Sequence, residues 1–156
     1  MYEGKSIKTI CICFKANTGV LYRLIELALL EQAIIVTPDY RLLPESSGLD
    51  ILSDLSSFWS WMTENLESTI AGFYPDLKLR PDFDRLLVTG GSGGGYLAAQ
   101  SMLLHPEMNI KAVVMPYPMV DLRTRFWDEE FEKPIFGAKT VSCIIVLIAF
   151  FPTKLM

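Results

Sequence analysis

One glycine-rich stretch carries a serine at a spacing that suits nucleophilic chemistry. Residues 90–94 read Gly-Gly-Ser-Gly-Gly, which fits G-x-S-x-G, a pattern that sets a serine on a sharp strand-to-helix turn. The apolar run Leu86–Val88 predicts a buried strand before it. We expect a helix to begin near Tyr96, or earlier if Ser92 caps it. Glycines two residues before and after the serine remove side chains that would crowd such a turn.

The predicted helix would direct the free N–H groups of its first turn toward Ser92, where they could stabilise an oxyanion. An acyl-transfer nucleophile is therefore the first interpretation. The second is a plain glycine-rich turn in which Ser92 is the helix N-cap. The third is a dinucleotide loop, because Gly93, Gly95 and Ala98 satisfy the loose form of G-x-G-x-x-G/A. It ranks last because Val113 stands where an acidic residue is wanted.

The chain contains one histidine, His105, and we predict that it is not the base for Ser92. The two residues lie at opposite ends of one predicted helix, roughly 20 Å apart at about 1.5 Å per residue. A base must lie within about 3 Å of the proton that it takes. Pro106 supports a helix end here, where the helix dipole favours an imidazole.

Predicted strands and helices alternate along the chain. Strands are expected at Ile7–Phe14, Ala33–Thr37, Leu86–Val88 and Ile110–Met115, and helices at Val20–Gln32, Asp50–Leu66 and after Ser92. We expect an irregular connection over Thr69–Asp84, which Gly72, Pro75 and Pro81 interrupt. The alternation predicts an α/β fold with a mostly parallel sheet and helices on both faces. The carboxyl ends of its strands would bring 39–45, 90–95 and 116–121 to one edge.

The composition excludes several classes of protein. With 156 residues, 51% of them hydrophobic, the chain can form one domain with a core. A net charge of −4 argues against non-specific nucleic-acid binding. One histidine and three cysteines provide no metal site or disulfide framework, so we predict a cytoplasmic protein without a cofactor. The apolar run Val141–Phe151 is shorter than the about 20 residues of a membrane-spanning helix.

A second block makes the motif more specific. Residues 39–45 read Asp-Tyr-Arg-Leu-Leu-Pro-Glu, which resembles the D-Y-R-L-x-P-E block of the α/β-hydrolase fold-3 group, the hormone-sensitive-lipase-like carboxylesterases. The resemblance covers roughly 21–137 and includes Asp54, Trp59, Trp61, Tyr117, Pro118 and Asp121. It implies a serine esterase or lipase acting on short to medium acyl esters. The implied site consists of Ser92 as nucleophile, the Gly93 N–H as oxyanion donor, and supporting residues Gly90, Gly91, Gly94, Asp39, Arg41 and Glu45, of which Arg41 and Glu45 brace the loop.

The chain departs from the family pattern in three places. Lys15–Gly19 stands where the family has an H-G-G-G loop that supplies further oxyanion donors. The acid and histidine that follow the serine in the family are missing, and Ala138–Met156 does not resemble the family. We therefore expect a partial α/β-hydrolase domain at 1–137 and a divergent apolar tail at 138–156, in a shortened gene product.

These departures leave two functions open. One is an impaired ester hydrolase, and the other is a non-catalytic binding or interaction module on a degenerate hydrolase fold. In both cases a sheet that ends after its fourth strand has an unpaired edge. We therefore expect poor solubility or self-association through that edge.

Overall fold

The computed structural model describes residues 6–12 and 18–123. The chain divides into two units, Met1–Val120 and Asp121–Met156, and all the helices and strands given below lie in the first unit. Our predictions for residues 13–17 and for the tail at 138–156 lie outside the described residues.

Four parallel strands form one sheet in the order β2-β1-β3-β4. They are β1 (Ser6–Ile12), β2 (Ala33–Val36), β3 (Arg80–Thr89) and β4 (Ala112–Val114). The connections contain the helices α1 (Thr18–Glu31), α2 (Gly48–Phe73) and α3 (Gly93–Leu104), and the short 3-10 helices η1 (Pro75–Leu77) and η2 (Pro106–Met108). Parallel neighbours require such crossovers, and the predicted α/β fold class is confirmed.

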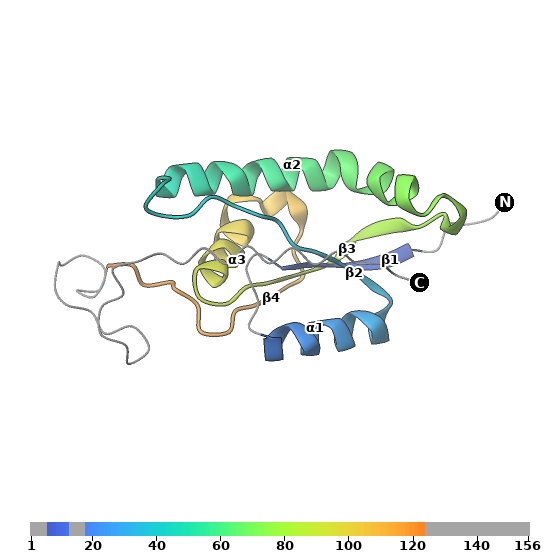
Figure 1. Ribbon diagram of the computed structural model, residues 1–156, viewed down its shortest axis with the longest axis horizontal. Coiled ribbons are helices and arrows are strands. Elements are labelled where there is room, and N and C mark those ends of the chain that lie inside the picture. Colours follow the sequence, from blue (N-terminus) through green and yellow to red (C-terminus); the bar gives the residue numbers. More distant parts are fainter. Residues whose placement is uncertain (1–5, 13–17, 124–156) are drawn as a thin grey trace. The chain divides into compact units, whose positions relative to one another are not determined.

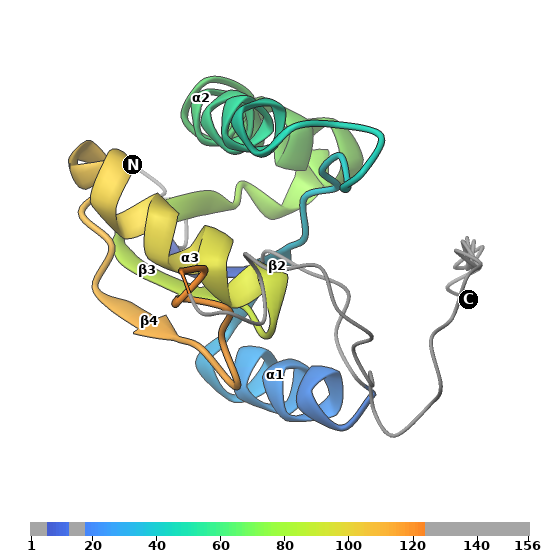
Figure 2. The same cartoon turned by 90° about the vertical axis from the view of Figure 1, so that its left-hand side faces the viewer.

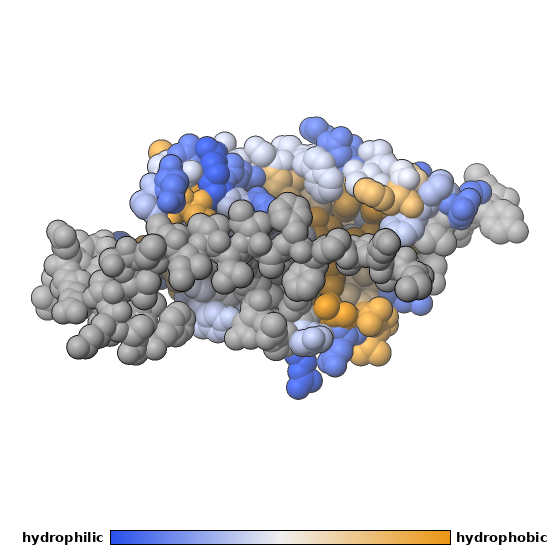
Figure 3. All heavy atoms as spheres, in the orientation of Figure 1, coloured by the Kyte–Doolittle hydropathy of each residue, from blue (hydrophilic) through white to orange (hydrophobic). Residues whose placement is uncertain are grey.

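The helices cover both faces of the sheet, as predicted. Helix α1 lies on one face, whereas α2 and α3 lie on the other (Figures 1 and 2). Hydrophilic side chains gather on the outer side of α2, and hydrophobic side chains are visible beneath it (Figure 3). This distribution is that of an amphipathic helix packed on a sheet.

Strand β3 separates two apolar cores, because successive side chains of a strand point to opposite faces. Leu86 and Val88 are buried in the larger core, with α2 and α3. Leu87 packs in the smaller core, with Leu24 and Ala28 of α1. Helices α2 and α3 contribute to the larger core the buried residues Leu55, Trp59, Met62, Leu66, Ile70, Leu97 and Ala98. The buried side chains of α3, the helix of the serine motif, therefore share one core with those of α2 and β3.

Helix α2 is longer than the predicted Asp50–Leu66. It begins at Gly48 after the N-cap Ser47, whose side chain accepts a hydrogen bond from the Asp50 N–H while the Asp50 carboxylate accepts one from the Ser47 N–H. It continues to Phe73 through Gly72, because Ile70 lies one helical turn beyond Leu66 and is also buried. Burial thus outweighs the modest cost of one glycine in a helix.

The prediction of an irregular connection over Thr69–Asp84 was also wrong at its C-terminal end. Strand β3 begins at Arg80 and includes Pro81, which lies opposite Ile7 of β1. The pairing of the two strands shifts register between Lys8 and Thr9, so the ladder is interrupted close to the proline. Proline lacks the N–H that a regular ladder uses, and such an irregularity accommodates it.

The predictions for β2 and β4 hold with shorter bounds, whereas β1 begins at Ser6, one residue before the predicted Ile7. Strand β4 keeps three of the residues in the predicted Ile110–Met115, and β2 ends at Val36. Both β2 and β4 are edge strands of the described sheet. No helix within residues 6–12 and 18–123 combines the length and the apolar character that crossing a membrane requires.

Candidate functional site

Ser92 has a backbone conformation that few residues other than glycine adopt. Its φ is 53° and its ψ is −128°, between the last residue of β3 and the first residue of α3. A positive φ of this kind costs on the order of 1–3 kcal/mol and persists only where the surrounding structure enforces it. The side chain is exposed and makes no capping hydrogen bond. Ser92 is thus the N-cap residue of α3, which begins at Gly93, as the second interpretation expected, but its side chain does not make the capping hydrogen bond.

Glycines allow this turn because backbone segments touch there. A Cβ on Gly90 would overlap the Gly94 carbonyl, and one on Gly95 would lie 2.6 Å from the Pro118 Cβ. A Cβ on Gly91 would lie 3.1 Å from the Tyr117 ring. Gly94 is buried. Gly95 also makes a close contact, although the G-x-S-x-G pattern does not include this position. By contrast, a Cβ on Gly93 would meet open space.

In the first turn of α3, two backbone N–H groups donate within the turn, and, among the described residues, that of Gly93 is left free beside Ser92. The Gly95 N–H donates to the carbonyls of Gly91 and Ser92 at 3.2 and 3.0 Å, and the Tyr96 N–H donates to Ser92 at 3.3 Å. Within the described part of the chain, the Gly93 N–H has no such backbone acceptor. The first N–H groups of a helix point toward its N-terminal end, where they can bind an anion.

A segment after β4 lies against the serine turn. The Ser92 N–H donates to the Tyr117 carbonyl at 3.1 Å, and the Met119 N–H donates to the Ser92 carbonyl at 3.0 Å. The Ser92 hydroxyl contacts the Met119 thioether, with 3.4 Å between Oγ and Sδ. The Gly90 N–H donates to the Val114 carbonyl at 3.1 Å. Sequence reasoning placed these two loops at one edge but did not identify Met119, for which the local sequence gives no signal.

The loop over residues 39–45 is attached to α2 by Arg41. Its guanidinium donates to both oxygens of the Asp54 carboxylate, at 2.8–3.1 Å, and to the Asp50 carbonyl at 2.9 Å. The Arg41 backbone N–H donates to Asp54 as well, at 2.9 Å. These hydrogen bonds from Arg41 lower the pKa of Asp54. The pKa of Asp50 is also lowered, chiefly by hydrogen bonds from Ser47.

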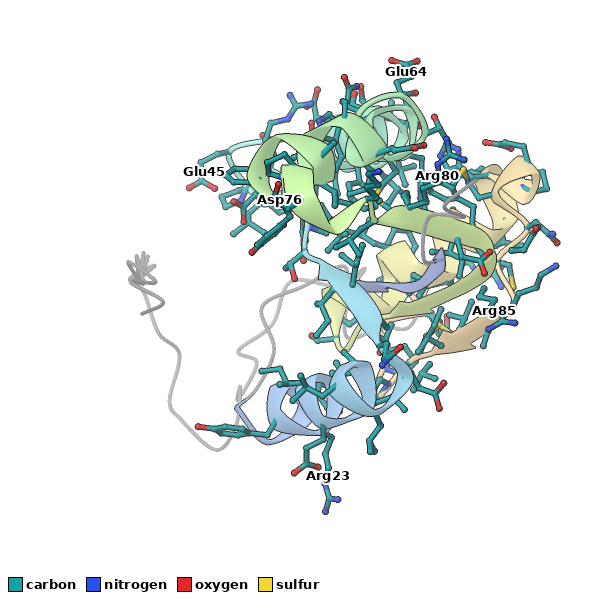
Figure 4. The ribbon with its side chains drawn as sticks, turned by 90° about the vertical axis from the view of Figure 1, so that its right-hand side faces the viewer. Arg23, Glu45, Glu64, Asp76, Arg80 and Arg85 are labelled. Atoms are coloured by element: carbon teal, nitrogen blue, oxygen red, sulfur yellow. The ribbon has the colours of Figure 1, made fainter. Side chains whose placement is uncertain are left out.

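The other two candidates in this loop have no described contact with the serine turn. Asp39 is exposed at the rim of a small hollow that Tyr40, Phe58 and Leu97 also line. The Glu45 side chain is exposed and points away from the surrounding ribbon (Figure 4). Among the described residues, no ion pair or hydrogen bond of the Glu45 side chain braces the loop; its expected role falls to Asp54 instead.

His105 lies at the far end of α3 from Ser92, as predicted, and its ring nitrogens face other residues. Nδ1 is 3.0 Å from Glu107 Oε1, and Nε2 is 3.4 Å from the Ser56 hydroxyl. The Glu107 pKa is lowered, first by a backbone hydrogen bond and then by His105. Within the described residues, no three histidine, cysteine or carboxylate side chains come together as a metal site would require.

We predict opposite effects of alanine at two neighbouring glycines. Gly90→Ala should lower the free energy of unfolding by on the order of 3 kcal/mol or more, because the new Cβ overlaps backbone that cannot rotate away. Gly93→Ala, the matched control, should be neutral or stabilising by about 0.5–1 kcal/mol, since it adds helix propensity in open space and keeps its N–H. Urea titration followed by circular dichroism measures both. If Gly90→Ala and Gly93→Ala lowered the free energy of unfolding equally, the contact at Gly90 would not be what shapes the turn.

The Arg41–Asp54 interaction should make stability depend on pH in the acid range. Because the folded-state pKa of Asp54 is depressed, its contribution is present above the unfolded-state value of about 3.9 and is lost as the pH falls through the folded-state pKa. Asp54→Asn should therefore flatten the loss of stability below about pH 5. Glu64→Gln is the control, because Glu64 is exposed and has no described ion pair. Urea midpoints from pH 3 to pH 7 test this, and parallel acid limbs for wild type and Asp54→Asn would contradict it.

Comparisons with known proteins agree with the fold described above. Residues 21–151 match the family described as alpha/beta hydrolase fold. The chain is 51% identical over 94 residues to the probable carboxylesterase M8 of a Phoma species, covering 60% of this chain and 29% of that protein. It is 48% identical over 88 residues to the probable carboxylesterase clz11 of Cochliobolus lunatus, covering 56% and 39% respectively. The chain thus spans well under half the length of either relative.

Two solved structures share the fold at low sequence identity. One is the Francisella virulence factor BioJ, with a TM-score of 0.51 and 21% identity over 81% of this chain and 40% of that one. The other is a sugar hydrolase, YeeB, from Lactococcus lactis, with a TM-score of 0.53 and 17% identity over 90% and 56%. The family match, which covers most of the chain, and the strand-turn-helix geometry at Ser92 agree. The chain belongs to the α/β-hydrolase fold-3 family of carboxylesterase-like hydrolases.

Proposed function

We propose that this chain carries the nucleophile of a carboxylic ester hydrolase and that Ser92 is that nucleophile. The observation that carries the proposal is the conformation of Ser92. Its hydroxyl is exposed on a turn with positive φ, at the N-terminus of α3. This is the arrangement that a nucleophile elbow needs, because it keeps the hydroxyl clear of the sheet.

The chemistry follows from the groups around the turn. The Ser92 oxygen would attack the acyl carbon, and the carbonyl oxygen would become an anion that the Gly93 N–H can stabilise. The ester C–O bond would then break, releasing the alcohol, and water would hydrolyse the acyl-serine. The serine proton needs an acceptor, and His105 faces Ser56 and Glu107 instead. Within the described residues the Ser92 hydroxyl contacts the Met119 thioether, which is not a base, so we expect solvent water to take the proton and turnover to be slow.

The substrate class follows from the relatives. Both curated relatives are named probable carboxylesterases, which supports acyl esters as substrates. Oxyanion donors and binding alone can leave about 10³–10⁴-fold catalysis over water after a triad is lost, which sets the scale of the activity expected here. We also propose that the chain is cytoplasmic, on the basis of its odd number of cysteines.

The rival proposal is a binding or interaction module without turnover. It is favoured by the position of the one histidine, which is engaged at the opposite end of α3. A module of this kind would bind an acyl compound or a partner protein through the same edge of the sheet. It would not hydrolyse an ester in a manner that depends on Ser92.

Covalent labelling separates these two proposals. A fluorophosphonate probe should label the folded chain at Ser92, detected by peptide mass spectrometry, because an exposed serine at free N–H donors can be phosphonylated. Ser92→Ala should abolish labelling, whereas Ser56→Ala, which removes the hydroxyl next to His105, should leave it unchanged. The wild-type chain should hydrolyse p-nitrophenyl acetate faster than the Ser92→Ala variant does. A folded chain with neither labelling nor Ser92-dependent hydrolysis would favour the binding module.

The edges of the sheet support a proposal about assembly. Strands β2 and β4 each pair with one neighbour in the described sheet, and unpaired edges favour strand addition. We expect the isolated chain to self-associate. Sedimentation velocity that shows a monomer at all concentrations would contradict this expectation.

A further inference from the structure

The contact between Ser92 and Met119 has a consequence for the substrate. The Met119 thioether is 3.4 Å from the Ser92 hydroxyl oxygen. Sulfur of this type is a weak hydrogen-bond acceptor and a flexible, polarisable apolar group. It holds the hydroxyl less firmly than a carbonyl or an imidazole would. What the thioether does provide is volume beside the reacting oxygen.

The backbone fixes Met119 at this place. Pro118, the residue before it, pairs with Ser92 as an isolated parallel bridge, and hydrogen bonds of 3.0 and 3.1 Å join Ser92 to Met119 and Tyr117. Pro118 is also in close contact with Gly95, where even one added carbon would clash. The segment therefore cannot move away from the serine turn without breaking hydrogen bonds or packing. The backbone therefore keeps the Met119 side chain beside the Ser92 hydroxyl.

We propose that Met119 forms the wall of the acyl subsite and restricts it to acyl groups without a branch next to the carbonyl carbon. This inference rests on the proposed function of Ser92. An acyl carbon bonded to the Ser92 oxygen would lie one bond length from it. Carbon atoms need about 3.5–4.0 Å of separation, so a branch on the Met119 side would overlap the thioether unless that side chain turned away.

The test measures how the size of the group on the reacting atom changes the labelling rate in wild type and in Met119 variants. Wild type, Met119→Ala and Met119→Leu are treated with two fluorophosphonates, one with a methyl group and one with an isopropyl group on phosphorus. The ratio of isopropyl to methyl labelling rates at Ser92 is measured by mass spectrometry. Met102→Ala is the matched control, because Met102 lies in the last turn of α3 and is 48% exposed.

Met119→Ala should raise the ratio at least about tenfold, the scale on which a pocket distinguishes single methylene groups. Met119→Leu keeps most of the volume without the sulfur, so its ratio should stay within about threefold of wild type. Met102→Ala should not change it. Labelling at Ser92 with the same ratio in wild type and Met119→Ala would overturn the inference and leave the proposed function standing.

A second measurement does not depend on the reactivity of Ser92. Methionine labelled with ¹³C in its methyl group gives one NMR signal for each of the seven methionines, and Met119→Leu identifies that of Met119. Added 2-hexanone, an unreactive carbonyl compound, should shift the Met119 signal and leave that of Met102 unchanged. A shift without Ser92 labelling would overturn the proposed function but support the subsite. Absence of both would overturn the two proposals together.

Discussion

The close approach of three backbone segments at the carboxyl end of β3 is the constraint on which the candidate site depends. Gly90 touches the first turn of α3, and Gly95 in that turn touches Pro118 after β4. Neither contact leaves room for a Cβ, so the strand, the helix and the later segment hold one another at van der Waals distance. This packing is what can hold Ser92 at a φ of 53°, since a strained residue persists only where its surroundings enforce it.

Helix α2 connects this turn to the second loop of the site. The buried Trp59 indole donates to the Ser101 hydroxyl of α3 at 3.1 Å, which satisfies a donor that would otherwise be costly to bury. The same helix presents Asp54, and Arg41 binds there. A disturbance of α2 would therefore reach both the orientation of the helix behind Ser92 and the loop over residues 39–45. The long helix is the common support of two loops that are distant in sequence.

The order of the elements could be predicted because strands and helices differ in periodicity over a few residues. Their ends could not, since the extension of α2 through Ile70 and the strand at Pro81 depend on what packs against them. The capping box at Ser47 is an exception, because its S-x-x-D spacing is local and recognisable. The partner of Arg41 and the position of Met119 are tertiary contacts over 13 and 27 residues, and no local pattern encodes them.

The two ends of α3 show why side-chain identity alone does not define a serine nucleophile. At one end Ser56, His105 and Glu107 are in contact, the same chemical groups as in a catalytic triad. Ser56, however, lies inside α2, where the regular helix uses the neighbouring N–H groups. At the other end, about 18 Å away by helix length, Ser92 lies beside the free Gly93 N–H but has no histidine. Oxyanion stabilisation is usually the largest single contribution to such catalysis, and a base adds about 10²–10⁴-fold. If Ser92 is the nucleophile that we propose, its backbone geometry would supply a contribution that a hydroxyl inside a regular helix, such as that of Ser56, cannot supply.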